Sequence, residues 1–314
     1  MDVTVVIAGP TAAGKSALAV ALARRYQATG LAAEIINADA MLVYRGMDIG
    51  TAKPTAAERG GVTHHLIDIL DVRETATVAD FQQLARAQVD ACRAQDVVPI
   101  LVGGSALYLR AILDDFQFPG TDPAVRAELE AELAHIGSAA LHGRLAGIDP
   151  EAAARMEPNN GRRVVRALEV IRLTGAPYHA ALPAWEYLLP DVVQVGLRLD
   201  RPTLDARIAL RVDQMWAAGF VDEVRRLSEH GLREGVTASR ALGYRQILRF
   251  LDGDLEESQA REQTVFGTRR FARRQDSWFR RDHRVHWLDH ADPRLVDRAY
   301  AIAGPPGDGR TSPR

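Results

Sequence analysis

The sequence of 314 residues holds a single cysteine, Cys92. One cysteine excludes an internal disulfide framework and is typical of a protein from a reducing compartment. No apolar run approaches the roughly 18–20 residues that a membrane-spanning helix needs, and the first residues lack the basic stretch that opens a signal peptide. These absences predict a soluble, cytoplasmic protein with no membrane partner. The hydrophobic fraction of 47% in turn excludes a mostly disordered chain.

Lysine is also scarce. Lys15 and Lys53 are the only lysines among 39 basic residues, so arginine is the default cation of this chain. A lysine retained against that bias suits a place where a compact point charge is needed and a planar guanidinium would not fit. Both lysines are therefore candidates for binding an anion.

The apolar patterning predicts an α/β fold. The β-branched run at residues 3–8 reads as a buried parallel strand, and further strands are expected at 34–39, 66–70 and 97–102. Helices are expected at 17–26, at 77–94 and from 105 to about 113. Strands that alternate with helices predict a parallel sheet flanked by helices.

The pattern changes after residue 115. Residues 116–190 contain helical segments, seven prolines and no convincing strand, which predicts a helical insertion domain. Strand character returns at 192–199 and again at 285–288, with helices between. The core is thus predicted to comprise residues 1–115 and 191–303. The tail, 304–314, is rich in Gly, Pro and Ser and is expected to be disordered.

A phosphate-binding motif follows the first strand. It has the form G-x-x-x-x-G-K-[ST] and consists of Gly9, Pro10, Thr11, Ala12, Ala13, Gly14, Lys15 and Ser16. The glycines let backbone N–H groups curl around a phosphate, the lysine meets its charge, and the Ser16 hydroxyl can hold Mg²⁺. A strand, this loop and a helix in succession predict a P-loop NTPase-like sheet.

Two further strand ends carry polar side chains. Asp39 closes the second strand, at the edge of the sheet where ligands bind in such folds, and could serve as a general base or a Mg²⁺ ligand. Ser105 follows Gly103-Gly104 and could either face the same crevice or cap the following helix. Lys53 lies close enough in sequence to Asp39 to reach the same anion.

Arginines mark the remaining candidate sites. Arg207 and Arg211 share one helix face and could clamp a diphosphate, or pair with neighbouring aspartates. Residues 261–284 hold eight arginines against three acids, with aromatic residues interleaved. That composition favours a nucleic-acid surface, the alternative being an amphipathic helix with an arginine-rich polar face. A second basic cluster, Arg162, Arg163 and Arg166, lies in the insertion.

Taken together, these stretches resemble the tRNA dimethylallyltransferases, also called tRNA isopentenyltransferases, of bacterial type. The resemblance rests on residues 9–16, 37–54, 101–108, 163–170, 240–246 and 273–278, in family order over nearly the whole chain. Residues 44–54 are its most specific part.

The resemblance implies transfer of a dimethylallyl group from dimethylallyl diphosphate to N6 of the adenosine 3′ of a tRNA anticodon, assisted by Mg²⁺. By analogy Asp39 is the general base and Ser105 lies beside the reacting centre, while residues 9–16 and Arg211 bind the diphosphate. The insertion grips the anticodon stem, and the two substrates enter a channel from opposite ends. A monomer is expected. The residues that match tRNA-contacting positions are Asp39, Ala40, Met41, Leu42, Ser105, Arg162, Arg163, Arg166, Arg240, Gly243, Tyr244, Arg245, Arg273, Arg274, Gln275 and Trp278.

The sequence departs from the family pattern at three of these positions. Ala40 stands where the family has serine, Leu42 where many members have glutamine, and Ser105 where threonine is usual. Other functions remain open from the residues alone. They are a small-molecule kinase using ATP, a non-catalytic RNA-binding protein, and an enzyme that prenylates free adenine nucleotides.

Overall fold

The computed structural model describes residues 3–178 and 183–304, which form two compact units. One unit is Met1–Asp115 with Trp185–Arg314, and the other is Phe116–Ala184. Residues 185–190, expected in the insertion, pack on the larger unit instead. The Trp185 ring lies against the Arg110 guanidinium at 3.8 Å, and Tyr187 forms an isolated β-bridge with Asp114. The predicted tail falls, apart from Gly304, outside the described residues.

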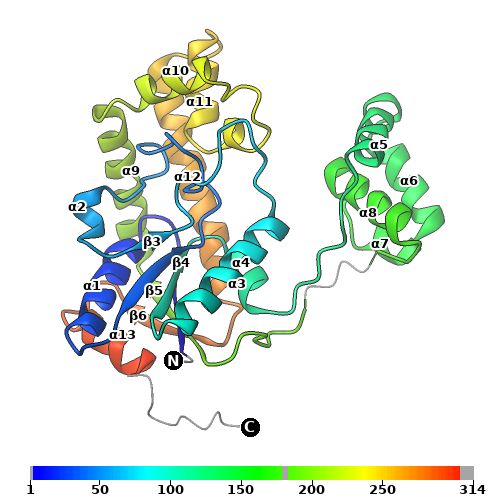
Figure 1. The fold of residues 1–314 in the computed structure, drawn as a ribbon. Coiled ribbons are helices and arrows are strands. Elements are labelled where there is room, and N and C mark those ends of the chain that lie inside the picture. Colours follow the sequence, from blue (N-terminus) through cyan, green and yellow to red (C-terminus); the bar gives the residue numbers. More distant parts are fainter. Residues whose placement is uncertain (1–2, 179–182, 305–314) are drawn as a thin grey trace. The chain divides into compact units, whose positions relative to one another are not determined.

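The larger unit is built on a six-stranded sheet in the order β3-β2-β4-β1-β5-β6, with every pair parallel (Figure 1). The strands are β1 (Thr4–Ala8), β2 (Ala33–Asn37), β3 (His64–His65), β4 (Val98–Gly103), β5 (Val192–Arg198) and β6 (Val285–Asp289). This confirms the predicted P-loop NTPase-like fold. Because all strands run the same way, the loops that follow β1, β2 and β4 meet at one edge of the sheet.

The strand expected at residues 66–70 is wrong. The structure has a two-residue strand, β3, just before that segment. Leu66 and Asp68 take positive φ values of 59° and 57°, which an extended strand cannot accommodate. Leu70 forms only an isolated bridge to Tyr44. The apolar residues of this segment therefore pack as an irregular loop.

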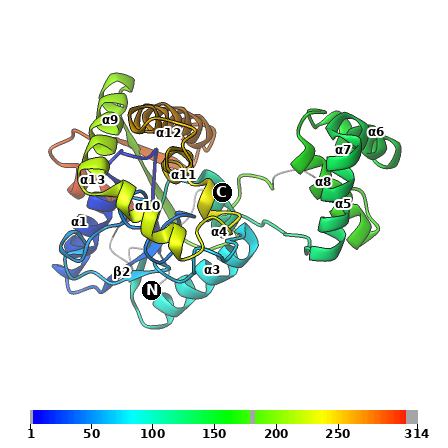
Figure 2. The same ribbon diagram turned by 90° about the horizontal axis from the view of Figure 1, so that it is seen from above.

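Helices cover both faces of the sheet. The helices of this unit are α1 (Lys15–Gln27), α2 (Ala56–Arg59), α3 (Val78–Ala94), α4 (Ala106–Leu113), α9 (Arg201–Ala217), α10 (Phe220–Glu229), α11 (Tyr244–Leu251), α12 (Glu257–Phe279) and α13 (Leu295–Ala303). Alternate strand residues face opposite ways, so Val6 and Ile36 pack with α3 while Val5 and Ile35 pack with α1. Helix α12 packs against α9 and α11, and both views place it beside α9 (Figures 1 and 2).

The smaller unit is helical, as predicted. It comprises α5 (Pro123–Ile136), α6 (Ser138–Ile148), α7 (Pro150–Ala154) and α8 (Gly161–Thr174). Leu129, Leu141 and Val164 belong to a separate apolar core. Among the described residues of the whole chain, no helix is both long and apolar enough to cross a bilayer.

Candidate active site

The loop between β1 and α1 has the backbone shape of an anion cradle. Gly9, Ala12 and Gly14 take positive φ values of 144°, 64° and 100°, which turn the chain sharply before α1 begins at Lys15. At Gly9 a Cβ atom would lie 3.2 Å from the carbonyl oxygen of Leu197, so glycine also permits the close approach of β5. A helix N-terminus that follows such a turn presents N–H groups to a phosphate.

Lys15 is the first residue of α1, directly after this loop. Its ammonium donates to the carbonyl oxygen of Pro10 at 2.8 Å. Burial lowers the pKa of Lys15 to about 8, with the positive charge of Arg211 adding to the effect and the carboxylate of Asp39 opposing it. The three charged groups are therefore close enough to interact, and an anion bound among them would stabilise the charged lysine.

Asp39 lies just beyond β2, held by its neighbours. The side-chain amide of Asn37 donates to the Asp39 carbonyl and to the Leu66 carbonyl, at 2.9 and 3.0 Å. Its amide oxygen accepts from the Asp39 N–H at 2.8 Å, and the Met41 N–H donates to Oδ1 of Asp39 at 2.9 Å. Sequence analysis gave no role to Asn37, which fixes the turn that carries the carboxylate.

Ser105 is at the N-cap position of α4, but its side chain makes no capping hydrogen bond. The alternative of a simple helix cap is therefore not supported. The two preceding glycines bring this loop close to its neighbours. A Cβ atom at Gly103 would lie 2.5 Å from the Ala38 carbonyl oxygen, and one at Gly104 would lie 2.6 Å from Nε2 of Gln275.

Gln275, expected to contact tRNA, is buried within the protein. Its amide donates to the Gly104 carbonyl at 2.7 Å and accepts from the Thr11 N–H at 2.9 Å. One side chain of α12 thus ties together the phosphate loop and the loop that carries Ser105. The Gln275 amide is used to position these loops.

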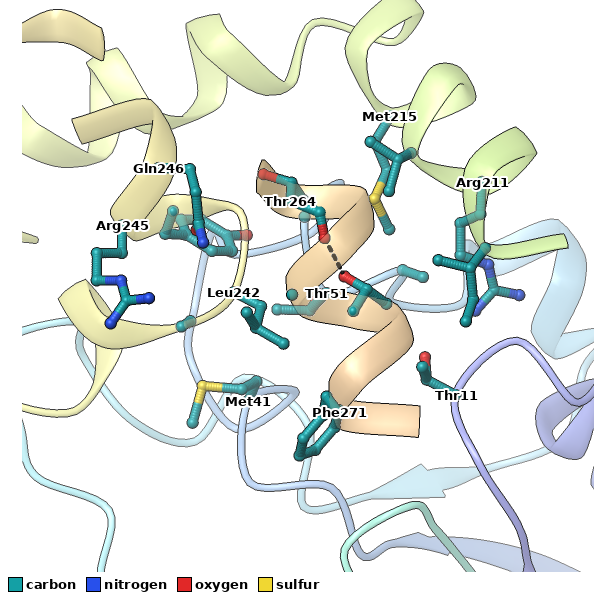
Figure 3. A pocket seen from close by; sticks show the side chains of 18 of the residues that line it. Thr11, Met41, Thr51, Arg211, Met215, Leu242, Arg245, Gln246, Thr264 and Phe271 are labelled. Atoms are coloured by element: carbon teal, nitrogen blue, oxygen red, sulfur yellow. Dashed lines mark hydrogen bonds between the residues drawn. The ribbon is translucent and has the colours of Figure 1, made fainter. Parts of the chain in front are cut away.

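One cavity of about 870 Å³, drawn in Figure 3, is lined by residues of the phosphate loop and of the loops that carry Asp39 and Ser105. Its polar lining includes Thr11, Asp39, Ser105, Arg211, Arg240, Arg245, Gln263, Arg270 and Arg274. Its apolar lining includes Met41, Ile208, Val212, Met215, Leu242, Phe266 and Phe271. In Figure 3, Arg211 and Met215 come from α9 while Phe271 comes from α12. Its volume fits a ligand of small-molecule size, since such pockets span about 300–1,000 Å³.

The loop at residues 48–52 forms part of the cavity wall, and Glu223 holds it. This buried carboxylate accepts from the backbone N–H groups of Asp48, Ile49 and Gly50, at 3.1, 2.7 and 3.2 Å. It also accepts the Tyr244 hydroxyl at 2.6 Å. Burial and the charge of Glu223 raise the pKa of Tyr244, so this phenol stays protonated and donates. Sequence analysis missed Glu223, because nothing near it in the sequence marks its partners.

Lys53 does not reach the phosphate loop. Its buried ammonium donates to the Tyr44 carbonyl at 2.8 Å, to the Asp48 carboxylate at 2.6 Å and to the Asp68 carboxylate. The hypothesis that Lys53 meets the same anion as Lys15 is therefore wrong. Lys53 instead links Tyr44, Asp48 and Asp68 inside the protein.

The structure separates the arginines into two groups. Arg240, Arg245 and Arg274 line the cavity, and burial together with Arg207 lowers the pKa of Arg211 there. Other arginines of residues 261–284 form ion pairs or hydrogen bonds within the protein. Arg261 pairs with Asp213, Arg280 with Asp276, and Arg284 with Asp114 and Asp282, while Arg269 donates to the Asp205 carbonyl.

The other predicted tRNA-binding residues have varied surroundings. Tyr244 and Gly243 are buried beside Phe220, and Trp278 packs on the core. Ala40 lines the cavity, while Leu42 and Arg273 are at least partly exposed.

Arg162, Arg163 and Arg166 lie in α8 of the smaller unit. Arg162 and Arg163 are exposed. Arg166 donates to the buried Glu169 and to the carbonyl of Gly120, at 2.8 and 3.0 Å.

Comparison with known proteins gives consistent matches. The family model described as IPP transferase matches residues 42–282. The tRNA dimethylallyltransferase of Thermobifida fusca is 62% identical over 302 residues, covering 96% of this chain and 94% of that protein. That of Nocardioides sp. is 59% identical over 305 residues, covering 97% of each.

Solved structures match over a similar length. The full-length tRNA isopentenylpyrophosphate transferase of Bacillus halodurans superposes with a TM-score of 0.70 at 41% identity, covering 96% of each chain. A eukaryotic dimethylallyltransferase seen acting on tRNA has a TM-score of 0.78 at 26% identity, covering 96% of this chain and 77% of its own.

Proposed function

The chain belongs to the IPP transferase family of tRNA dimethylallyltransferases, and we propose how its core accommodates the two substrates. The enzyme transfers a dimethylallyl group from dimethylallyl diphosphate to N6 of the adenosine 3′ of the tRNA anticodon. The kinase alternative rested on residues 9–16. The family match over residues 42–282 lies outside that loop and favours prenyl transfer instead.

The observation that carries the placement is the shared cavity. Asp39, Ser105 and two residues of the phosphate loop, Thr11 and Ala12, line the same cavity although they are far apart in sequence. An exocyclic adenine amine is a weak nucleophile because its lone pair is delocalised into the ring. It needs a base within hydrogen-bond distance and an electrophile held in line. Asp39 takes the proton from N6, and the Ser105 hydroxyl orients the reacting groups.

The diphosphate occupies the loop at residues 9–16. As the allylic C–O bond breaks, negative charge grows on the leaving oxygen, and the loop N–H groups, Lys15 and Arg211 stabilise it. Oxygen ligands suit Mg²⁺, and the exposed Ser16 at the start of α1 supplies one. When bound, Mg²⁺ neutralises charge on the departing diphosphate. The apolar lining, Met215 and Phe271 among it, packs against the dimethylallyl chain.

The arginine-lined part of the cavity receives the RNA. Arg240, Arg245, Arg270 and Arg274 attract the phosphate backbone, and the target adenine must leave the anticodon stack at a cost of a few kcal/mol. The exposed arginines of α8 take the anticodon stem. A channel open at both ends, action as a monomer and a cytoplasmic location stay predictions.

Incubation with an unmodified anticodon stem-loop and dimethylallyl diphosphate, followed by mass spectrometry of the nucleosides, tests this function. We expect N6-dimethylallyladenosine at one position. Asp39→Asn is the control of strongly reduced activity, and ATP offered with small metabolites tests the small-molecule kinase. AMP as acceptor tests prenylation of free nucleotides. Phosphate transfer from ATP without prenyl transfer would overturn the proposal.

A further inference from the structure

A cluster of metal-ligating side chains lies apart from the cavity. Nε2 of His65, a carboxylate oxygen of Glu34 and Sγ of Cys92 all lie within 4.8 Å of one another. Of the described residues that line the cavity, none belongs to this cluster. The reaction described above therefore gives these three side chains no role.

The fold brings the three residues together from separate elements. Successive residues of a strand face opposite ways, so Glu34 and Ile36 of β2 share one face. His65 of β3 is in register with Ile36 and joins them there. Helix α3 covers this face, and Cys92 in its last turn packs in the same core cluster as Ile36. The arrangement is fixed by the backbone of a sheet and a packed helix, which suits a preformed site.

The ligand atoms are also poised toward one another. His65 and Glu34 share a hydrogen bond of 2.6 Å, and the Cys92 thiol donates to the same carboxylate oxygen at 3.8 Å. Cys92 is 2% exposed, while the side chains of His65 and Glu34 are 24% and 29% exposed. A cation can therefore approach from the partly exposed side chains of His65 and Glu34. It then meets the Cys92 sulfur, which is buried from bulk solvent.

We propose that Glu34, His65 and Cys92 bind a divalent cation of the zinc type, with water as a fourth ligand. Tetrahedral zinc takes sulfur at about 2.3 Å and nitrogen or oxygen at about 2.0–2.2 Å. Ligand atoms in such a tetrahedron lie about 3.3–3.7 Å apart. The thiol is already near that separation from the Glu34 carboxylate, and the imidazole and carboxylate, now 2.6 Å apart, would separate once the proton between them has left. Binding converts the thiol to a thiolate and releases its proton. The ion would link β2, β3 and α3.

The competing account is a His–Glu pair that happens to lie beside a buried thiol. It makes the same hydrogen bonds but predicts no metal binding through sulfur.

The test is titration of the chelator-treated, untagged protein with Co²⁺ in the presence of excess Mg²⁺. We expect one equivalent to give the thiolate-to-cobalt absorption and the visible bands of a tetrahedral site. Zn²⁺ should then displace the Co²⁺ and raise the melting temperature, because it binds the folded state. Cys92→Ser removes the thiolate band, weakens binding at least tenfold and leaves prenyl transfer unchanged.

Two further variants keep the result interpretable. Glu34→Gln, at a half-buried position, weakens Co²⁺ binding but keeps the thiolate band at higher metal concentration. His286→Gln changes an exposed histidine of β6 and leaves binding intact. Absence of a thiolate band in the folded parent protein, or loss of binding only in His286→Gln, would overturn the proposal.

Discussion

Removal of the Glu223 carboxylate tests whether the wall of the cavity depends on one buried acid. Glu223→Ala deletes the acceptor for three backbone N–H groups and the Tyr244 hydroxyl. Asp48 is exposed and can turn to water, whereas Tyr244 is fully buried. The variant therefore leaves some donors solvated and at least one without an acceptor.

The expected loss in the free energy of unfolding depends on how many of these donors stay buried without an acceptor. A hydrogen bond to a charged group contributes about 1.5–3 kcal/mol, and a buried donor left unpaired costs about 1–3 kcal/mol. Counting the Tyr244 hydroxyl and one backbone N–H in full, and the other N–H groups as solvated, gives a loss of about 3–6 kcal/mol. In a protein of this size such a loss lowers the melting temperature by on the order of 10 °C.

Tyr244→Phe is the matched control. It removes one hydroxyl, keeps the ring packed against Phe220 and leaves the three backbone bonds in place, so it should cost about 1 kcal/mol. Because Gly50 and Thr51 line the cavity, Glu223→Ala should also raise KM for dimethylallyl diphosphate or the RNA, even below the melting transition. Thermal melts and steady-state kinetics at a low temperature measure both effects. If Glu223→Ala melts within 1 °C of the parent, or keeps its KM values, the carboxylate does not hold this loop.

Asp39→Asn should lower kcat by about 10²–10⁴-fold, the usual contribution of a general base, and leave RNA affinity within a few-fold; an equal loss of affinity would make Asp39 a binding residue. Because the pKa of Lys15 is lowered to about 8, its positive charge is lost as pH rises through that value, so KM for dimethylallyl diphosphate should climb above pH 8. Lys15→Arg, which stays charged, should show no such climb, and the same pH profile in both would remove Lys15 from the diphosphate site. Neutralising Arg273 and Arg274 should weaken RNA binding and flatten its salt dependence. The slope of log K against log salt should fall by roughly one unit for each phosphate that is no longer neutralised. Arg280→Gln, which breaks a pair with Asp276, is the control that keeps the slope.

The parts of this fold that the sequence predicts are those encoded locally. The buried strand β1, the turn after it and the start of α1 lie within one stretch, and hydrophobic pattern and glycine positions specify them directly. The strand predicted at residues 66–70 was wrong because that prediction used the local hydrophobic pattern alone. Its apolar residues suit a strand, but tertiary contacts such as the bond from Asn37 to the Leu66 carbonyl hold it as a loop.

The site was predicted where residue type and strand position suffice. Asp39, Ser105 and Arg211 line one cavity, and Lys15 interacts electrostatically with Asp39 and Arg211. Glu223 and the loop-positioning role of Gln275 could not be found this way. The backbone partners of Glu223 lie 173–175 residues away in the chain, and the partners of Gln275 lie 171 and 264 residues away. From the sequence alone, an acid or amide side chain within a helix is expected to face solvent. Only the tertiary structure shows which partner it contacts.

The arginine-rich helix α12 shows why composition alone could not decide function. Some arginines of residues 261–284 line the cavity and others pair with acids, because the helix has several faces and composition does not distinguish the arginines on them. Packing against α9 and α11 turns Arg270 and Arg274 toward the cavity, while acids from other elements neutralise Arg261 and Arg284. The buried Gln275 fixes that rotation, because its amide must meet Thr11 and Gly104 at once. The residue that aligns the phosphate loop therefore also decides which arginines of α12 face the cavity.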